Sequence, residues 1–211
     1  MRTRSETGRV LGTPGGSLSN PDWLGASARG AARVGQAGEV RTAAVLDEFA
    51  RGGSVTVLHD LMTPSKKYKA NIDHVVVSGS TVYPIDSKVW KPGRYWTWGG
   101  RTRRGWERFT PAEKKTMVVI TQALEAYLAA RGVNAVVAEP LLFVWPSSKH
   151  SSLRTGLLTV PGARVVPGPR VQGTVSKLFG NRLRGGGQAA DERVVDALVP
   201  LLNRPGPSVF G

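Results

Sequence analysis

The fold is determined by a segment with two strand-like runs, residues 71–90, which reads NIDHVVVSGSTVYPIDSKVW. Both runs are rich in β-branched and aromatic side chains, which favour extended strands. The Ser-Gly-Ser sequence between them, residues 78–80, is typical of a tight turn. The segment therefore predicts an antiparallel hairpin.

The turn fixes which side chains face one another across this hairpin. A two-residue loop at Gly79-Ser80 places Asp73 opposite Asp86, a four-residue loop gives the same register, and a three-residue loop breaks it. Because side chains alternate along a strand, Asp86 and Lys88 share one face. Facing carboxylates, with Cβ atoms about 4.5–5.5 Å apart, repel each other unless a cation lies between them. Mg²⁺ prefers carboxylate and water oxygens, and Lys88 beside it can hold a water or neutralise charge on a phosphate.

A third acid, Glu39, falls on the apolar stripe of a helix that we expect to begin near Gly35. The stripe consists of Ala43, Leu46 and Ala50. An acid on a buried stripe needs a reason, and reaching a metal site is one. The alternatives stay open at this point. In the first alternative, Glu39 is an acid at the start of a helix, where the helix dipole favours it. In the second, Asp73 and Asp86 are solvated strand residues. In the third, Lys88 forms a surface ion pair with Asp86.

The remaining sequence predicts an α/β domain with a mixed sheet flanked by helices. Residues 1–34, rich in Gly, Ser, Arg and Pro, predict a flexible, disordered basic arm. The domain then covers residues 35–203, and residues 204–211 form a loose tail. Further elements are expected as a strand over 54–58, a capped helix over 110–131, a buried strand over 134–145, short strands within 153–166 and a helix over 189–199.

Composition restricts the function classes. A net charge of +14 attracts polyanions, nucleic acid first and anionic membranes second. Without cysteine there are no disulfides, thiolate zinc sites or cysteine nucleophiles, which suits a reducing cytoplasm. The three scattered histidines argue against a histidine zinc site. No apolar run approaches 18 residues, so we expect no membrane-spanning helix.

A basic and aromatic stretch follows the hairpin and has no clear period. Its arginines, able to grip phosphates, are Arg94, Arg101, Arg103 and Arg104. Interleaved tryptophans can stack on unpaired bases. A second basic patch consists of Lys66, Lys67 and Lys69. The alternative is that the tryptophans pack on the domain while the arginines and lysines are merely solvated.

The chain resembles the nuclease-related domain (NERD) family of the PD-(D/E)XK nuclease superfamily. The resemblance covers roughly residues 35–145. Its motifs are Gly38-Glu39, Asn71-Ile72-Asp73-His74, Ile85-Asp86-Ser87-Lys88 with Trp90 and Gly93, and Gln122 in a later helix. Asp86 stands where many relatives have glutamate, which shortens the ligand arm but keeps the chemistry.

This resemblance implies a restriction-endonuclease-like fold and a Mg²⁺- or Mn²⁺-dependent endodeoxyribonuclease, cutting DNA phosphodiester bonds by attack of a metal-activated water. It assigns Asp73, Asp86 and Glu39 as metal ligands and Lys88 as the group that orients water or stabilises charge. Glu39 and Gln122 would support the site. The rival is a non-cutting, basic nucleic-acid-binding or packaging protein on a nuclease-like fold. A third alternative, a structural protein that holds polyanions, leaves the motif unexplained.

Overall fold

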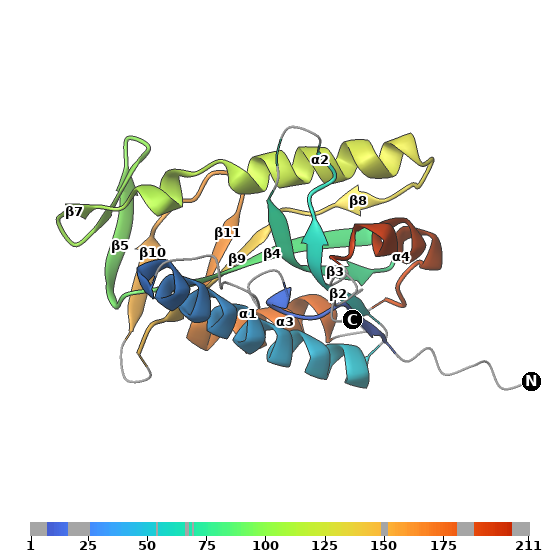
Figure 1. Ribbon diagram of the computed structural model, residues 1–211, viewed down its shortest axis with the longest axis horizontal. Helices are drawn as coiled ribbons and strands as arrows, with labels where there is room; N and C mark the ends of the chain where they lie inside the picture. The colour runs from blue at the N-terminus through green and yellow to red at the C-terminus, as the bar shows by residue number, and fades with distance from the viewer. Residues whose placement is uncertain are drawn as a thin grey trace, which may run out of the picture.

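A mixed β-sheet with helices on both faces forms the centre of the molecule (Figure 1). The computed structural model describes residues 8–16, 26–53, 55–65, 68, 70–148, 152–180 and 188–203. Within them the central sheet has the order β1 (Val10–Leu11), β2 (Thr56–Met62), β3 (Asn71–Ser78), β4 (Thr81–Trp90), β9 (Leu141–Pro146) and β11 (Arg164–Pro167), and β8 (Val136–Val137) also pairs with β4. The α/β class with a mixed sheet is confirmed.

The β3–β4 hairpin has the register that its sequence predicts. Ser78 pairs with Thr81, and the ladder continues antiparallel as far as His74 and Ile85. Gly79 at the turn has φ 57°, a left-handed conformation that glycine adopts without steric cost. On its other edge, β4 pairs in parallel with β9 from Ile85 to Trp90. The hairpin therefore lies in the middle of the sheet, where it is buried.

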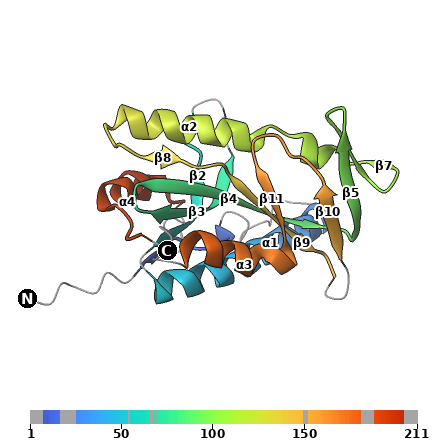
Figure 2. The same cartoon turned by 180° about the vertical axis from the view of Figure 1, so that it is seen from behind.

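Helices cover the two faces of the sheet, and each face has its own hydrophobic cluster (Figure 2). On one face lie α1 (Ala26–Gly52) and α3 (Gly168–Phe179), packed on Ile85 and Phe143. On the other lie α2 (Thr116–Ala130) and α4 (Glu192–Leu198), packed on Val75 and Leu142. The described part of the chain also contains the 3-10 helices η2 (Thr110–Glu113) and η4 (Val199–Leu201).

A second, smaller sheet extends from the end of β4 (Figure 1). Its order is β10 (Leu153–Leu157), β5 (Gly93–Trp98), β6 (Arg101–Arg104) and β7 (Glu107–Arg108). The stretch without a clear period is therefore a β-meander, to which β10 adds a parallel strand. The two short strands expected within residues 153–166 exist, but β10 and β11 belong to different sheets.

The expected unstructured arm over residues 1–34 is wrong for the part that the structure describes. Backbone bonds pair β1 in parallel with β2, and α1 already begins at Ala26. The prediction of an unstructured arm relied on the glycines and serines of this segment, whereas its several alanines before Gly35 favour a helix. Among the described residues, no helix combines the length and apolarity needed to cross a bilayer.

Three further expectations need correction. The helix expected over 110–131 is divided into η2 and α2, and no side-chain cap begins either one. Glu113 instead accepts the backbone N–H of Thr102. The strand expected over 134–145 is split into β8 and β9, with Pro140, which lacks a backbone donor, between them. Helix α3 was not expected, because its apolar residues are sparse.

Candidate active site

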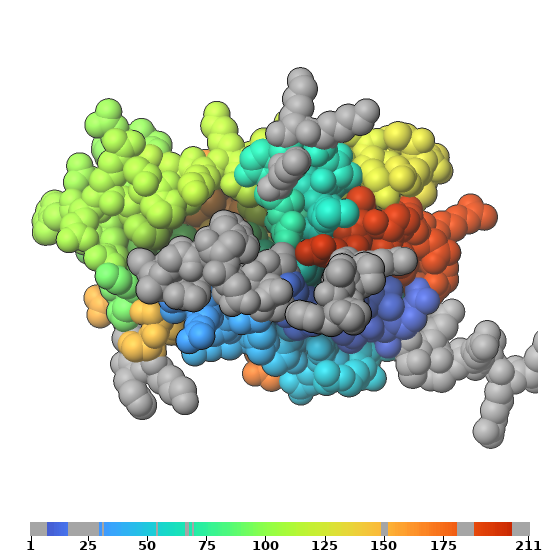
Figure 3. Space-filling model, viewed as in Figure 1, coloured from blue at the N-terminus to red at the C-terminus, as the bar shows by residue number. Residues whose placement is uncertain are grey.

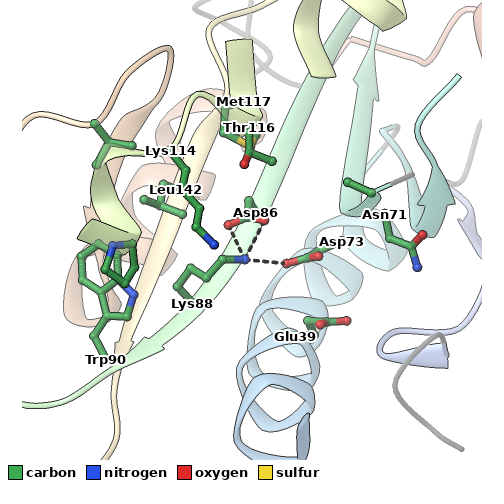
Figure 4. Close-up of a pocket in the computed structure, with 13 residues that line it drawn as sticks. Glu39, Asn71, Asp73, Asp86, Lys88, Trp90, Lys114, Thr116, Met117 and Leu142 are labelled. Atoms are coloured by element: carbon green, nitrogen blue, oxygen red, sulfur yellow. Dashed lines mark hydrogen bonds and ion pairs between the residues drawn. The ribbon is translucent and has the colours of Figure 1, made fainter. Parts of the chain in front are cut away.

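One pocket of 510 Å³ lies beside the point where β3 and β4 separate. Its acidic residues come from three elements: Glu39 from α1, Asp73 from β3 and Asp86 from β4. Lys88 on β4 also lines it, and Figure 4 shows its side chain directed at Asp86 and Asp73, with Glu39 close to Asp73. In the space-filling view the surface between the hairpin and α1 is partly hollowed (Figure 3).

Asp73 lies just beyond the last ladder pair of the hairpin. Its Oδ2 accepts the backbone N–H of Ser87 at 2.7 Å. The carboxylate thus satisfies a buried donor on β4 at the place where the two strands part. This bond fixes Asp73 beside Asp86, and the facing of the two acids expected from the hairpin is preserved by a side-chain contact rather than by ladder pairing.

A close approach of helix to sheet brings Glu39 to the same pocket. A Cβ atom on Gly38 would lie 2.6 Å from Cγ2 of Val89, so only glycine permits α1 to pack this tightly on β4. Glu39 follows directly and is 7% exposed, on the buried stripe with Ala43 and Leu46. The pairing of glycine with glutamate at this point of α1 therefore has a packing reason.

Lys88 is the cation at the centre of the acidic residues. Its Nζ lies 2.8 and 2.7 Å from the two carboxylate oxygens of Asp86 and 4.0 Å from Oδ2 of Asp73. Burial by itself lowers the pKa of Lys88, but Asp86 and Asp73 outweigh it and raise that pKa above its ordinary value. The ammonium group therefore stays charged. Its side chain is 47% exposed and accessible to a ligand in the pocket.

Two of the carboxyl groups resist ionisation. Burial raises the pKa of Glu39 to about 7, with Lys88 opposing the shift and Asp60 and Asp86 adding to it. Burial, and then the charge of Asp86, raise the pKa of Asp73 well above its usual range. One lysine thus does not compensate the negative charge that this pocket would carry with all its acids ionised.

The donor set suits a hard divalent cation, although its present arrangement is not a formed ion site. Within the described part of the chain, no three acidic or histidine side chains converge closely enough to hold a metal ion. The Nζ atom of Lys88 lies between Asp73 and Asp86 instead (Figure 4). Carboxylate oxygens are the ligands that Mg²⁺ prefers. A divalent cation would favour the ionised form of these carboxyl groups, whose pKa values are raised first by burial.

A buried hydrogen-bonded network lies behind the pocket, on the opposite face of β4. His59 and His74 contact each other through their Nδ1 atoms at 2.8 Å, and Nε2 of His59 lies 2.8 Å from Asp47. The other end of the chain is Nε2 of His74, 3.2 Å from Oγ of Ser87. Burial lowers the pKa of both histidines, which keeps them neutral. His74 therefore packs inside the protein and does not line the pocket.

Two residues were missed in the sequence: Lys114, which lines the pocket, and Asp60, whose charge acts on Glu39 from outside the lining. Asp60, 2% exposed with φ 53°, accepts from Nδ2 of Asn71 and from Nδ2 of Asn203. A left-handed aspartate inside a strand has no sequence signal. Lys114, between η2 and α2, lines the pocket, and its side chain extends toward Asp86 (Figure 4). In the sequence, the only indication of this role was that Lys114 lies close to the expected helix start at Thr110.

The structure does not bring every expected residue to the pocket. Gln122 is exposed on α2 and is not among the lining residues. The basic residues of the second sheet lie outside the pocket and comprise Arg94, Arg101, Arg103 and Arg104. Lys66, Lys67 and Lys69 lie outside the described residues.

Comparisons with known proteins give one family. The model of the nuclease-related domain (NERD) matches residues 34–143, which contain Glu39, both facing aspartates and Lys88. No curated protein and no solved structure matches the chain. The family match spans more than half of the 211 residues and includes all four polar residues at the centre of the pocket. The chain therefore belongs to the nuclease-related domain family.

Proposed function

We propose that the pocket is the active site of a metal-dependent nuclease that hydrolyses phosphodiester bonds of DNA. The observation that carries this proposal is that Glu39, Asp73, Asp86 and Lys88 line one pocket, in a chain of net charge +14. Such an arrangement gains nothing for stability, because it buries like charges together. Its value is in binding a cation and a phosphate next to each other.

The side chains divide the work. Glu39, Asp73 and Asp86 would hold Mg²⁺ or Mn²⁺, and Ser87 keeps Asp73 in place through its backbone N–H. When bound, the ion supplies Lewis-acid activation of water and of the scissile phosphate. Lys88, with three donors on a charged ammonium group, orients a water molecule or stabilises the negative charge that develops on the phosphate oxygens.

DNA is the substrate that we propose for the site. The basic charge favours a phosphate backbone, and nuclease-related is the description of the family. The rival is a member that holds nucleic acid but does not cut it. The acids and the lysine together favour cutting, because binding alone would be weakened by carboxylates in the groove.

The test compares purified wild type with Asp86→Asn on supercoiled and linear DNA, in Mg²⁺, Mn²⁺ and EDTA. We expect cleavage by the wild type with either ion and none in EDTA. Asp86→Asn should cut at least about 100-fold more slowly, since a charged ligand of the metal ion is lost. DNA binding in EDTA should persist and decrease steeply with salt.

A matched control is Glu125→Gln, which also changes a carboxylate to an amide but is exposed on α2, outside the pocket. It should cut like the wild type. Circular dichroism melting checks that both variants fold. Near wild-type cleavage by folded Asp86→Asn would contradict the site. Binding without any cleavage by the wild type would favour the non-cutting rival.

A further inference from the structure

The outward face of the second sheet has an unusual composition. Alternation along β5 directs Arg94, Trp96 and Trp98 to one side and Tyr95 and Thr97 to the other. Tyr95 is 1% exposed and packs on Trp90 and Phe109, with ring centroids about 5 Å apart. The Tyr95 side therefore faces the protein, and the Trp98 side faces the solvent.

The register extends this outward face over the neighbouring strands. On β6, Arg103 pairs with Trp96 and Arg101 pairs with Trp98. On β10, Arg154 pairs with Arg94 and Leu157 with Trp96. We call this surface the Arg–Trp face, and it consists of Arg94, Trp96, Trp98, Arg101, Arg103, Arg154 and Leu157. None of these positions is acidic.

Contacts within the face organise it for a flat, anionic ligand. Trp96 is held by a bond from its Nε1 to the backbone oxygen of Gly105, 2.9 Å away, and Arg103 lies 5.9 Å above its ring. Trp98 is 80% exposed. An apolar ring of this size in water gives up the stabilisation of burial, so a partner that stacks on it would restore that stabilisation.

Among the described residues, the ion pairs of this sheet are Arg104 with Glu107 and Arg108 with Glu113, and neither involves a residue of the Arg–Trp face. Arg104, on the inward face, forms an ion pair with Glu107 at 2.8 Å. Arg94 and Arg101 on the Arg–Trp face are exposed, and no ion pair joins either one to an acid among the described residues. The Arg–Trp face therefore combines positive charges with aromatic rings that lie between them. This pattern complements a single strand, whose phosphates are negative and whose unpaired bases can stack on the rings.

The second sheet directly follows the strand of the pocket along the chain. Strand β4 carries Lys88 and Trp90 in the pocket, and β5 begins at Gly93, three residues after Trp90. We propose that the Arg–Trp face binds a single-stranded segment of nucleic acid by stacking bases on Trp98 and Trp96 while the arginines bind phosphates. This rests on the proposed function, which it deepens by naming substrates with unpaired bases, such as single strands, flaps or frayed ends.

The experiment measures binding in EDTA, so that cleavage does not enter. Affinity for a fluorescein-labelled oligo-dT strand and for a mixed-sequence duplex is compared between wild type and Trp98→Ala. Loss of one stacked base should weaken oligo-dT binding about 5- to 100-fold. Duplex bases are already stacked on each other, so duplex binding should change less than about twofold. Trp98→Phe retains an aromatic face and should recover most of the affinity.

A second variant tests the phosphate contacts. Arg101→Ala should lower the slope of log affinity against log salt by about 0.7 for the single strand. Arg193→Ala is its matched control, because Arg193 is exposed on α4, outside the second sheet. It should lower the slope less. Equal slopes for the two arginine variants would overturn the phosphate part of the proposal.

Other outcomes separate this proposal from the nuclease. Unchanged oligo-dT affinity in Trp98→Ala, or equal loss for strand and duplex, overturns the stacking surface even if the wild type cuts DNA. Selective loss of oligo-dT affinity supports it even if no cleavage occurs in Mg²⁺ or Mn²⁺. If Trp98→Ala instead weakens only binding to phosphatidylserine vesicles, the face is a lipid surface and the proposal is wrong.

Discussion

The pocket and the Arg–Trp face are built from adjacent stretches of chain, yet they differ in charge, burial and construction. The pocket gathers carboxylates that are largely buried and fixed by backbone contacts, such as the Ser87 bond to Asp73. The Arg–Trp face presents cations and rings to water on a small peripheral sheet. Both regions use strands whose side chains alternate between two faces. The pocket is lined by side chains on a buried face, whereas the Arg–Trp face consists of side chains that point to the solvent.

The difference teaches that nucleic-acid binding and catalysis, as proposed, depend on different regions of this molecule. A deep acidic pocket repels a polyanion until a cation binds, whereas a basic and aromatic face attracts one without any ion. Under the two proposals, the protein would hold its substrate with one region and act on it with the other. If that division is correct, substitutions in the two regions should have opposite consequences for cutting and for binding.

The largest effect is expected from Lys88→Met. Removing the one cation that, among the described residues, lies within 4.0 Å of both aspartates should slow cleavage about 100- to 1,000-fold. Oligo-dT binding in EDTA should change less than about twofold, which is the reverse of Trp98→Ala. Cleavage and fluorescence anisotropy give the two readouts, with thermal melting as a folding check.

Lys177→Met is the control for that variant, because it removes an exposed lysine of α3, outside the pocket. It should cut normally. Should Lys88→Met weaken strand binding as much as Trp98→Ala does, the two regions are not separable and the comparison fails.

A smaller effect concerns pH and Glu39. In the folded protein its pKa is raised from 4.5 to about 7, so neutral Glu39 contributes stability that is complete below about pH 4.5 and is lost as pH rises through 7. In EDTA, Glu39→Gln should therefore be more stable than wild type by up to about 3 kcal/mol at pH 8, with the difference shrinking toward pH 5. Urea unfolding at several pH values measures this.

Mg²⁺ sharpens the same experiment. An ion held by the carboxylates favours their charged form, so it should stabilise the wild type at pH 8 more than Glu39→Gln. A stability difference that is the same at pH 5 and pH 8 would show that Glu39 does not titrate as its burial implies. Glu125→Gln, on the surface of α2, should show neither effect.

The smallest effect is expected from Ser87→Ala. Its Oγ bonds Oγ1 of Thr42 at 2.7 Å and lies 3.2 Å from Nε2 of His74, and both partners are buried. Losing the hydroxyl should cost about 1–2 kcal/mol of unfolding free energy. Cleavage should stay within about tenfold of wild type, because the backbone N–H that holds Asp73 remains. A larger loss of activity would mean that the histidine network positions the site.

Local patterns carried much of the candidate site. The Gly79 turn and period-2 alternation were enough to predict the register from Ser78–Thr81 to His74–Ile85, one pair short of Asp73 and Asp86. The helical stripe was enough to predict that Glu39 is buried. Each of these rests on contacts between residues near in sequence, which the chain specifies through backbone geometry.

Non-local pairing was not predictable. Parallel pairs such as β1 with β2 and β10 with β5 are held by backbone bonds, which no side-chain pattern records. The position of Asp60 was not predictable, because it depends on a left-handed backbone conformation within β2. Gln122 shows the converse, since a plausible motif position is exposed on α2.

The sequence by itself determined the hairpin, the acidic and basic residues that it carries and the overall positive charge. Only the tertiary structure decided which side of β5 faces water. Aromatic residues occur on both sides of that strand, so hydrophobicity has no period, and the choice was made when Tyr95 packed against Trp90 and Phe109. Burial of that one ring leaves Trp98 and the arginines outward, because neighbouring side chains on a strand must point to opposite faces.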